Sequence, residues 1–278
     1  MKIRSVARPG DTTGAAKNMF IAVDELENKM GSCRAEPLYL GEMMPERPCE
    51  VKISAGGEGG AMMHLLGTAL ARGIALAKES GVNARVYAEC APDDEIRMSL
   101  YKTIGLFDDD ALVKMSRCVV GGPNVVRLPE GCVLVADNLT DPQERAYFIE
   151  RQKQLFGREN AAEWLEEIGR KPLMKRLLVI SRKGLVGELV CWAEKGGKGC
   201  IGHVYTAPAW RRKGVALYLM GAARRYFYSC RLMESHVDVR IRMKAMMKVA
   251  ASAGYRQSDV LMRLPGIDLD APPPRIPL

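Results

Sequence analysis

The sequence contains no run of apolar residues long enough to cross a membrane. A spanning helix needs roughly 18 or more predominantly apolar residues, and no window of the 278-residue chain approaches that composition. The first residues, which include Lys2 and Arg4, also lack the apolar core of a secretory signal peptide. These absences predict a cytoplasmic protein with no membrane partner.

Cysteines at metal-ligand spacing are missing as well. The eight cysteines form no Cys-x-x-Cys pair, and they form no cluster with the three histidines at such spacing along the chain. We therefore expect reduced, mostly structural thiols and no metal ion.

Acidic residues are scarce in the last part of the chain. Residues 200–278 contain 13 Lys and Arg against 5 Asp and Glu, a balance of 13 − 5 = +8, which equals the net charge of the whole chain. A basic segment of this kind suits nucleic acid, an anionic membrane or a phosphorylated cofactor. The motifs within the segment must decide between these partners.

The composition is that of a soluble globular protein, with 47% hydrophobic and 27% charged residues, and the length favours two domains. Residues 121–124, Gly-Gly-Pro-Asn, form a turn signal before the strand-like segment 132–136. We therefore expect one domain at residues 1–120, a second at 131–266, and a Pro-rich tail at 267–278.

The second expected domain alternates helical and strand-like patterns. Apolar spacing predicts helices at 143–156, 160–169, 215–228 and 241–253, and strands at 132–136, 176–181, 185–193, 200–206, 235–239 and 255–264. Three consecutive strands without an intervening helix indicate an antiparallel meander. The order predicts an α/β (α+β) fold with a mixed, mostly antiparallel sheet flanked by helices.

Residues 211–216, Arg-Arg-Lys-Gly-Val-Ala, lie between a predicted strand and a predicted helix. A glycine at a helix start permits close backbone approach, and the unpaired N–H groups there favour an anion such as a pyrophosphate. The three cationic side chains add charge at the same place. The segment therefore predicts a turn that cradles phosphate.

This segment resembles the defining loop of the GNAT acyltransferase superfamily, Gln/Arg-x-x-Gly-x-Gly/Ala. The preceding strand with Pro208, the following helix, and a last helix ending in Gly254-Tyr255 extend the resemblance over residues 131–264. The resemblance implies acetyl-CoA, or a close acyl-CoA relative, as cosubstrate. Loop amides would hold its pyrophosphate, and strand backbone would pair with its pantetheine arm. The implied cofactor-binding residues are Tyr205, Thr206, Arg211, Arg212, Lys213, Gly214, Val215 and Ala216.

The resemblance also implies direct attack of a deprotonated amine on the thioester, with a tyrosine four residues before the Gly-aromatic pair as general acid. Here that position is Ala250, which leaves protonation of the leaving thiolate open. Solvent, Tyr226, Tyr228 and Tyr255 are the alternatives, and a thiolate with a pKa of about 8.5 can also leave unaided.

His203 is the first candidate for the catalytic base. It lies three residues before Thr206, on the strand where relatives often carry a carboxylate, and an imidazole suits proton uptake near neutral pH. Glu188 on the preceding strand is the second candidate, and Glu194 in the turn after it is the weakest. For each of these residues a purely structural or solvated role is the alternative.

The N-terminal half resembles a degenerate copy of the same unit. Residues 50–54 align with strand 202–206, Gly60 aligns with Gly214, and Tyr101 stands four residues before Gly105. The first loop lacks the Arg/Lys cluster, whereas the first closing helix keeps the tyrosine. This predicts two tandem GNAT-like domains in which the first is structural or shapes the acceptor site, with weak CoA binding as the alternative.

The expected function is N-acyltransfer from acyl-CoA to a primary amine of a small molecule, an amino acid or a peptide. A non-catalytic acyl-CoA-binding regulatory module is the alternative, motivated by Ala250. Nucleic-acid binding is disfavoured, because the cofactor phosphates account for the basic segment and no nucleic-acid motif accompanies it. The sequence leaves open whether the chain forms a homodimer.

Overall fold

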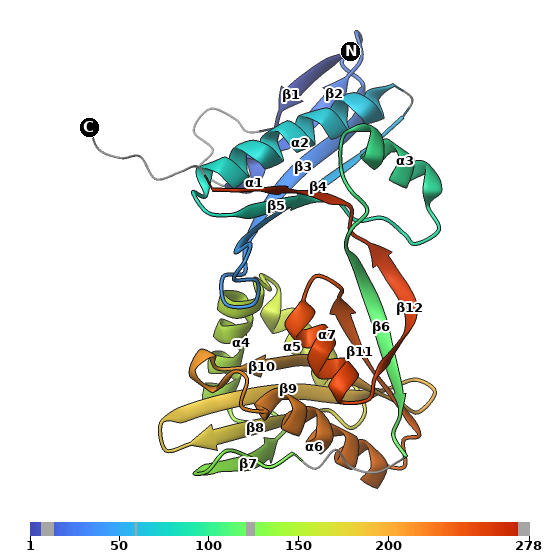
Figure 1. The fold of residues 1–278 in the computed structure, drawn as a ribbon. Coiled ribbons are helices and arrows are strands. Elements are labelled where there is room, and N and C mark those ends of the chain that lie inside the picture. The colour runs from blue at the N-terminus through green and yellow to red at the C-terminus, as the bar shows by residue number, and fades with distance from the viewer. Residues whose placement is uncertain (7–13, 59, 121–125, 272–278) are drawn as a thin grey trace, which may run out of the picture. The chain divides into compact units, whose positions relative to one another are not determined.

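The computed structural model of the chain describes residues 1–6, 14–58, 60–120 and 126–271, which form two compact units (Figure 1). Unit 1 contains Met1–Ala111 and Met262–Leu278, and unit 2 contains Leu112–Leu261. The chain thus passes from unit 1 into unit 2 and returns at its end. None of the described helices is long and apolar enough to span a bilayer.

Unit 1 is built on a six-stranded sheet with the order β1-β2-β3-β4-β5-β13, in which only the β4–β5 pair is parallel. Helix α2 packs along this sheet (Figure 1), and its buried residues recur at helical spacing. The elements are β1 (Lys2–Ser5), α1 (Gly14–Lys17), β2 (Met19–Val23), β3 (Lys29–Tyr39), β4 (Cys49–Gly57), α2 (Ala61–Glu79), β5 (Ala84–Tyr87), α3 (Glu95–Thr103) and β13 (Gly266–Leu269).

Unit 2 is built on a seven-stranded sheet with the order β12-β6-β11-β10-β9-β8-β7. Strands β7 to β10 form an antiparallel meander, whereas β10 pairs with β11 in parallel. The elements are β6 (Ala111–Cys118), β7 (Cys132–Asp137), α4 (Pro142–Phe156), α5 (Ala161–Gly169), β8 (Lys175–Ser181), β9 (Gly184–Glu194), β10 (Lys198–Thr206), α6 (Val215–Ser229), β11 (Glu234–Arg240), α7 (Lys244–Ser252) and β12 (Arg256–Arg263).

The two faces of the unit 2 sheet are covered by different helices. Phe148 of α4 and Leu165 of α5 pack against Val190 and Trp192 of β9. Alternate residues of β9 point the other way, and a Cβ added to Gly187 would lie 2.7 Å from a methyl group of Val215 in α6. The face under α4 and α5 carries the candidate base residues, and α6 covers the opposite face.

The structure confirms the expected fold of two mixed α/β units, but it divides the chain at other positions than 120 and 131. Strand β6 pairs along its length with β11, so this part of the expected first domain belongs to the unit 2 sheet. Strand β13 lies in the expected 267–278 tail and pairs with β5 of unit 1. Neither segment was predicted as a strand, because the strand that pairs with it lies far away in the sequence. Residues 121–125 and 272–278 lie outside the described residues.

The two units share a closing motif that supports their expected relation as repeats. In unit 1 the Leu106 N–H donates to the Tyr101 carbonyl at 3.0 Å, across Gly105 with a φ of 89°. In unit 2 the Tyr255 N–H donates to the Ala250 carbonyl at 3.0 Å, across Gly254 with a φ of 87°. Both helices thus end in the same left-handed glycine turn before a buried residue.

Candidate functional site

Strands β10 and β11 are paired over only part of their length. Their parallel ladder joins residues 198–201 to residues 234–237 and ends there, although β10 continues to Thr206 and β11 to Arg240. On its other side β10 stays paired with β9 as far as Gly187. The second half of β10 therefore offers one edge to which an extended, peptide-like chain can add.

The two strands diverge where β10 contains a bulge. Ile201 is opposite Cys191 and His203 is opposite Val190, so Gly202 has no counterpart in β9. A Cβ at Gly202 would lie 2.1 Å from the ring of Trp192, which leaves room only for glycine. A bulge bends its strand and increases the local twist, and here it accompanies the separation of β10 from β11.

The loop after β10 ends in an uncapped helix start. Gly214 has a φ of 80°, and the first intrahelical bond runs from the Tyr218 N–H to the Gly214 carbonyl at 2.9 Å. In the described part of the chain no side chain caps α6. The N–H groups of Val215, Ala216 and the next residue therefore have no acceptor within the helix, and they lie at the positive end of its dipole.

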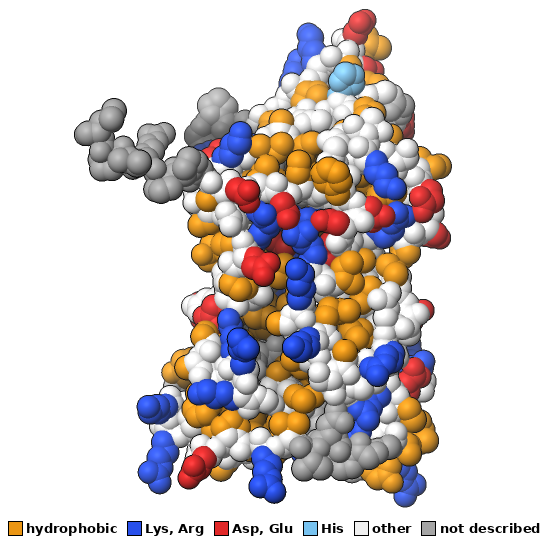
Figure 2. Space-filling model, viewed as in Figure 1, with side chains coloured by type: hydrophobic (Ala, Val, Ile, Leu, Met, Phe, Trp, Pro, Cys, Tyr) orange, Lys and Arg blue, Asp and Glu red, His pale blue; other side chains and the backbone are white. Residues whose placement is uncertain are grey.

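Cationic side chains surround this helix start. The Arg211 Nε–H donates to the Thr206 carbonyl at 3.3 Å, and the Lys213 ammonium lies 4.8 Å from the Trp210 ring centroid. Arg212, with a φ of 63°, is exposed. On the face of unit 2 in the lower part of Figure 2, Lys and Arg side chains clearly outnumber Asp and Glu. The loop therefore combines free amides with positive charge.

A buried polar atom at the end of β10 also lacks a partner. The Thr206 Oγ1 is buried and has no hydrogen-bond partner within the described residues. Such an atom costs about 1–3 kcal/mol unless a ligand or water satisfies it. The strand edge, this hydroxyl and the cationic helix start form a continuous segment of chain, and they fit a ligand with a polar extended arm that ends in a pyrophosphate.

The structure brings His203 and Glu188 together. The His203 Nε2 lies 3.2 Å from the Glu188 Oε1, and both side chains are almost fully buried. The other ring nitrogen, Nδ1, lies 3.3 Å from the Gln152 amide nitrogen on α4. The imidazole also stacks on Phe148 with a centroid distance of 5.6 Å, and the tilted ring of Phe156 lies 5.1 Å away.

Glu188 is held as a carboxylate by His203 and two arginines. Its Oε2 accepts from Arg151 at 2.6 Å and lies 3.5 Å from a nitrogen of the buried Arg176. Burial acts to raise the pKa of Glu188, but the hydrogen bond and charge of His203, with the charges of both arginines, outweigh it and lower the pKa below 4.5. Glu188 is therefore ionised at neutral pH.

The contacts of Gln152 allow His203 two protonation states. As oriented, the Gln152 amide donates to Nδ1, so Nε2 carries the proton donated to Glu188. The Gln152 Oε1 is buried without a partner in the described chain. If the amide turned over, Oε1 would accept from a protonated Nδ1, and the imidazolium would lie beside the Glu188 carboxylate.

The third candidate base, Glu194, lies apart from this pair. It is six residues further along β9 than Glu188, a distance of about 20 Å at the rise of an extended strand.

The three tyrosines that could protonate the leaving thiolate have other surroundings. The Tyr255 hydroxyl is hydrogen-bonded to Ser235 at 2.9 Å, and burial raises the pKa of Tyr255. The Tyr226 hydroxyl donates to the Leu173 carbonyl at 3.2 Å. Burial, followed by Cys230, raises the pKa of Tyr226 to about 12. Tyr228 is 63% exposed.

Three contributors to this site were missed in the sequence: Gln152 and Arg151 on α4, and Arg176 on β8. The two helix residues lie in a run rich in Glu, Arg, Lys and Gln, which reads as a solvated surface. Arg176 begins a predicted strand and gives no sign of burial. None of the three carries a local signal that could have identified it.

Comparison with known proteins supports the fold. No family profile and no curated protein sequence matches the chain. Among solved structures, a GCN5-related N-acetyltransferase from Sphaerobacter thermophilus aligns with 91% of this chain and 81% of its own, at 17% identity and a TM-score of 0.51.

Two further solved structures were compared. A probable N-acyltransferase from Enterococcus faecalis V583 aligns with 89% of this chain, at 15% identity and a TM-score of 0.55, and this chain spans only 61% of its length. A tandem GNAT protein from the clavulanic acid biosynthesis pathway aligns with 92% of this chain and 83% of its own, at 13% identity and a TM-score of 0.46.

The chain therefore has the fold of the GCN5-related N-acetyltransferases. More particularly, it contains two GNAT-like units in tandem, as the sequence resemblance predicted. At these identities the comparisons establish the fold, and the chemistry must be argued from the residues of the site.

Proposed function

We propose that the chain is an N-acyltransferase that uses acetyl-CoA or a short acyl-CoA through unit 2. The observation that carries this proposal is the start of α6, where Gly214 leaves uncapped amides beside Arg212 and Lys213. Amides from Arg212 to Ala216 would hold the pyrophosphate, and the backbone at Tyr205 and Thr206 would hold the pantetheine arm. When bound, the cosubstrate supplies a thioester that an amine can attack.

The chain itself would manage the proton of the attacking amine. His203 takes up a proton at Nδ1 when the Gln152 amide turns over, and the Glu188 carboxylate stabilises the resulting imidazolium. His203, Arg151 and Arg176 together lower the pKa of Glu188 and keep it ionised. In this proposal His203 is the base and Glu188 is its partner.

Arg158 favours an acceptor that carries a negative group near its amine, such as an amino acid. Its guanidinium lies 3.8 Å from the Trp164 ring centroid, and the Trp164 and His203 ring centroids are 6.3 Å apart. Burial lowers the pKa of Arg158, which means that its charge is partly desolvated. A carboxylate of the acceptor would compensate that desolvation.

Calorimetric titration with acetyl-CoA and with CoA tests the binding half of the proposal. Reversing the loop charge with Arg212→Glu and Lys213→Glu should weaken binding at least tenfold. The matched control, Arg170→Glu with Lys171→Glu, makes the same change of charge on the exposed end of α5. If the loop variant binds as tightly as the control, the loop assignment is wrong.

Release of free thiol from acetyl-CoA in the presence of an amine panel tests the chemistry. We expect amino acids to support faster release than their uncharged amides. His203→Gln should cut turnover while leaving the acetyl-CoA Kd unchanged. Tight binding without release from any amine would favour the regulatory acyl-CoA-binding module, which the missing tyrosine at Ala250 also suggests.

A further inference from the structure

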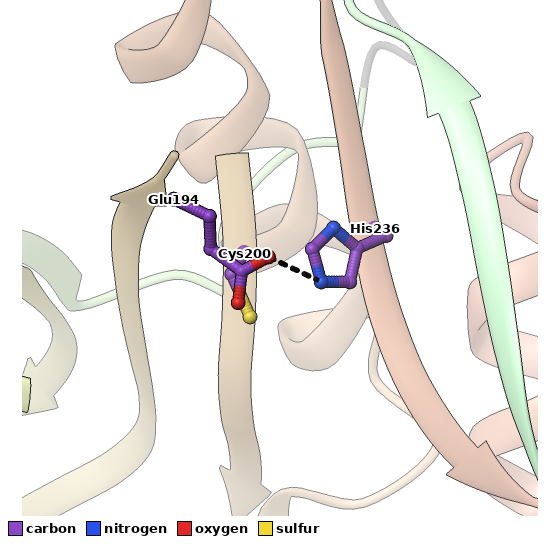
Figure 3. A group of neighbouring side chains, drawn as sticks. All are labelled: Glu194, Cys200 and His236. Atoms are coloured by element: carbon purple, nitrogen blue, oxygen red, sulfur yellow. Dashed lines mark ion pairs between the residues drawn. The ribbon is translucent and has the colours of Figure 1, made fainter. Parts of the chain in front are cut away.

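Three side chains that can act as metal ligands come together on the unit 2 sheet (Figure 3). Cys200 of β10 lies directly opposite His236 of β11 in their parallel ladder, and Glu194 ends the neighbouring strand β9. Their ligand atoms all lie within 4.8 Å of one another. The Glu194 Oε2 and the His236 Nε2 are 3.5 Å apart, as the dashed line in Figure 3 marks.

Two of the three donor side chains are buried, and the third borders solvent. Cys200 and His236 are 6% and 3% exposed, whereas the Glu194 side chain is 40% exposed and leaves a path from solvent. Cys200 packs in the same hydrophobic cluster as Trp192 and Val190, which fixes its side of the sheet. The rigid ladder between β10 and β11 therefore sets the spacing of the two buried donors.

Charged groups of both signs surround the cluster. The carboxylates of Glu194 and Asp238 lie near Cys200 and His236, and the ammonium group of Lys114 lies near both as well. A cation bound by the cluster would therefore have two carboxylates and one ammonium group beside it.

We propose that Glu194, Cys200 and His236 bind a divalent transition metal ion, with zinc as the best match to this donor set. Thiolate, imidazole and carboxylate are the ligands that Zn²⁺ takes in proteins, and three protein ligands leave a fourth position for water. In a tetrahedral Zn²⁺ site such donors are about 3.3–3.7 Å apart, and the Glu194–His236 pair already has that separation. Rotation of the side chains brings in the sulfur by roughly 1 Å.

Binding replaces one bond at sulfur by another. The S–H bond of Cys200 breaks, a sulfur–zinc bond forms, and the proton goes to solvent or buffer. No oxidant, reductant or further reactant is involved. The site lies at the opposite end of β9 and β10 from Gly187 and Thr206, so it is separate from the proposed acyl-CoA loop and does not depend on acyl transfer.

Titration of the metal-free full chain with CoCl₂ and then ZnCl₂ tests the proposal. Cobalt bound to a thiolate gives a sulfur-to-metal charge-transfer band, so the band reports cysteine ligation. We expect one Co²⁺ per chain with this band, and loss of the band when Zn²⁺ is added. Cys200→Ser should abolish the band, whereas the control Cys191→Ser, a buried thiol on the neighbouring strand, should retain it.

Glu194→Gln serves as a variant that is expected to fold normally, because its side chain is half-exposed. It should weaken Co²⁺ binding at least tenfold, and His236→Gln should weaken it further. Absence of the band in the unmodified chain would overturn the proposal. A band that survives Cys200→Ser, or metal affinity unchanged by Glu194→Gln, would overturn it equally.

Discussion

Gly214 has a backbone conformation that other residues adopt only with strain. Its φ is 80°, and a Cβ would lie 3.1 Å from a methyl group of Val126. Gly214→Ala should therefore destabilise unit 2 by about 1–2 kcal/mol. Urea unfolding followed by tryptophan fluorescence measures this effect on unit 2, because all three tryptophans lie within residues 112–261.

Gly221→Ala is the matched control on the same helix. An added Cβ there would meet only the end of the Arg225 side chain at 3.7 Å, so the alanine should be neutral or stabilise the helix by about 0.5–1 kcal/mol. If the two substitutions lower the free energy of unfolding equally, the positive φ of Gly214 does not destabilise an alanine at that position.

Glu188→Gln should be among the more damaging substitutions in unit 2, because it removes the buried carboxylate that Arg151 and His203 contact, although Arg176 keeps Asp137. The expected loss is about 3–5 kcal/mol at pH 7. Glu144→Gln is the control, since Glu144 contacts the same arginine but is 51% exposed, and its loss should stay below about 1 kcal/mol. Urea unfolding by tryptophan fluorescence compares the two.

The same carboxylate gives unit 2 a defined response to acid. The pKa of Glu188 is lower in the folded than in the unfolded chain, so its contribution is complete above about 4.5 and is lost as the pH falls through the lower folded pKa. The difference in stability between the unmodified chain and Glu188→Gln should therefore shrink below pH 4.5. Unfolding curves at pH 7 and at progressively acidic pH measure this difference, and a gap that stays constant would contradict the pKa shift.

At the scale of the elements, strand β10 depends on its bulge. Gly202→Ala would place a methyl group within the ring of Trp192, and overpacking of this kind costs about 1–3 kcal/mol. The double variant with Trp192→Phe should recover part of the loss, because it removes the clashing atoms. If the losses of stability caused by Gly202→Ala and by Trp192→Phe simply add in the double variant, the methyl group at position 202 does not clash with the Trp192 ring.

The helices of unit 2 and its strands β7 to β12 were predictable, because their apolar residues follow the two periods of helix and strand, but strand β6 was not predicted. The loop ending at Gly214 was predictable from its spacing. The contact of His203 with Glu188 was not, because it depends on the register shift at Gly202. The cluster of Cys200, His236 and Glu194 was missed for a related reason: its members are far apart in the sequence and meet only through strand pairing.

At the scale of the whole molecule, each sheet needs a strand from a distant part of the chain. Strand β6 completes unit 2, and β13 completes unit 1 by pairing with β5. Domain limits drawn from the linear sequence at residues 120 and 131 miss this arrangement, because pairing between distant strands leaves no local signal. A segment that looks like a tail can therefore be part of a sheet.

Truncation after Pro265 should destabilise unit 1 and leave unit 2 folded. It removes β13 and with it Asp268, whose carboxylate lies 2.9 Å from the buried Arg85. Arg85 would keep its ion pair with Asp109 and lose the one with Asp268, whose side chain is 31% exposed. In addition, β5 would become an unprotected edge. Hydrogen exchange should show that the amides of residues 84–87 lose protection. Truncation after Ala271 is the control, and exchange at residues 84–87 that is the same in both truncations would mean that β13 adds nothing to unit 1.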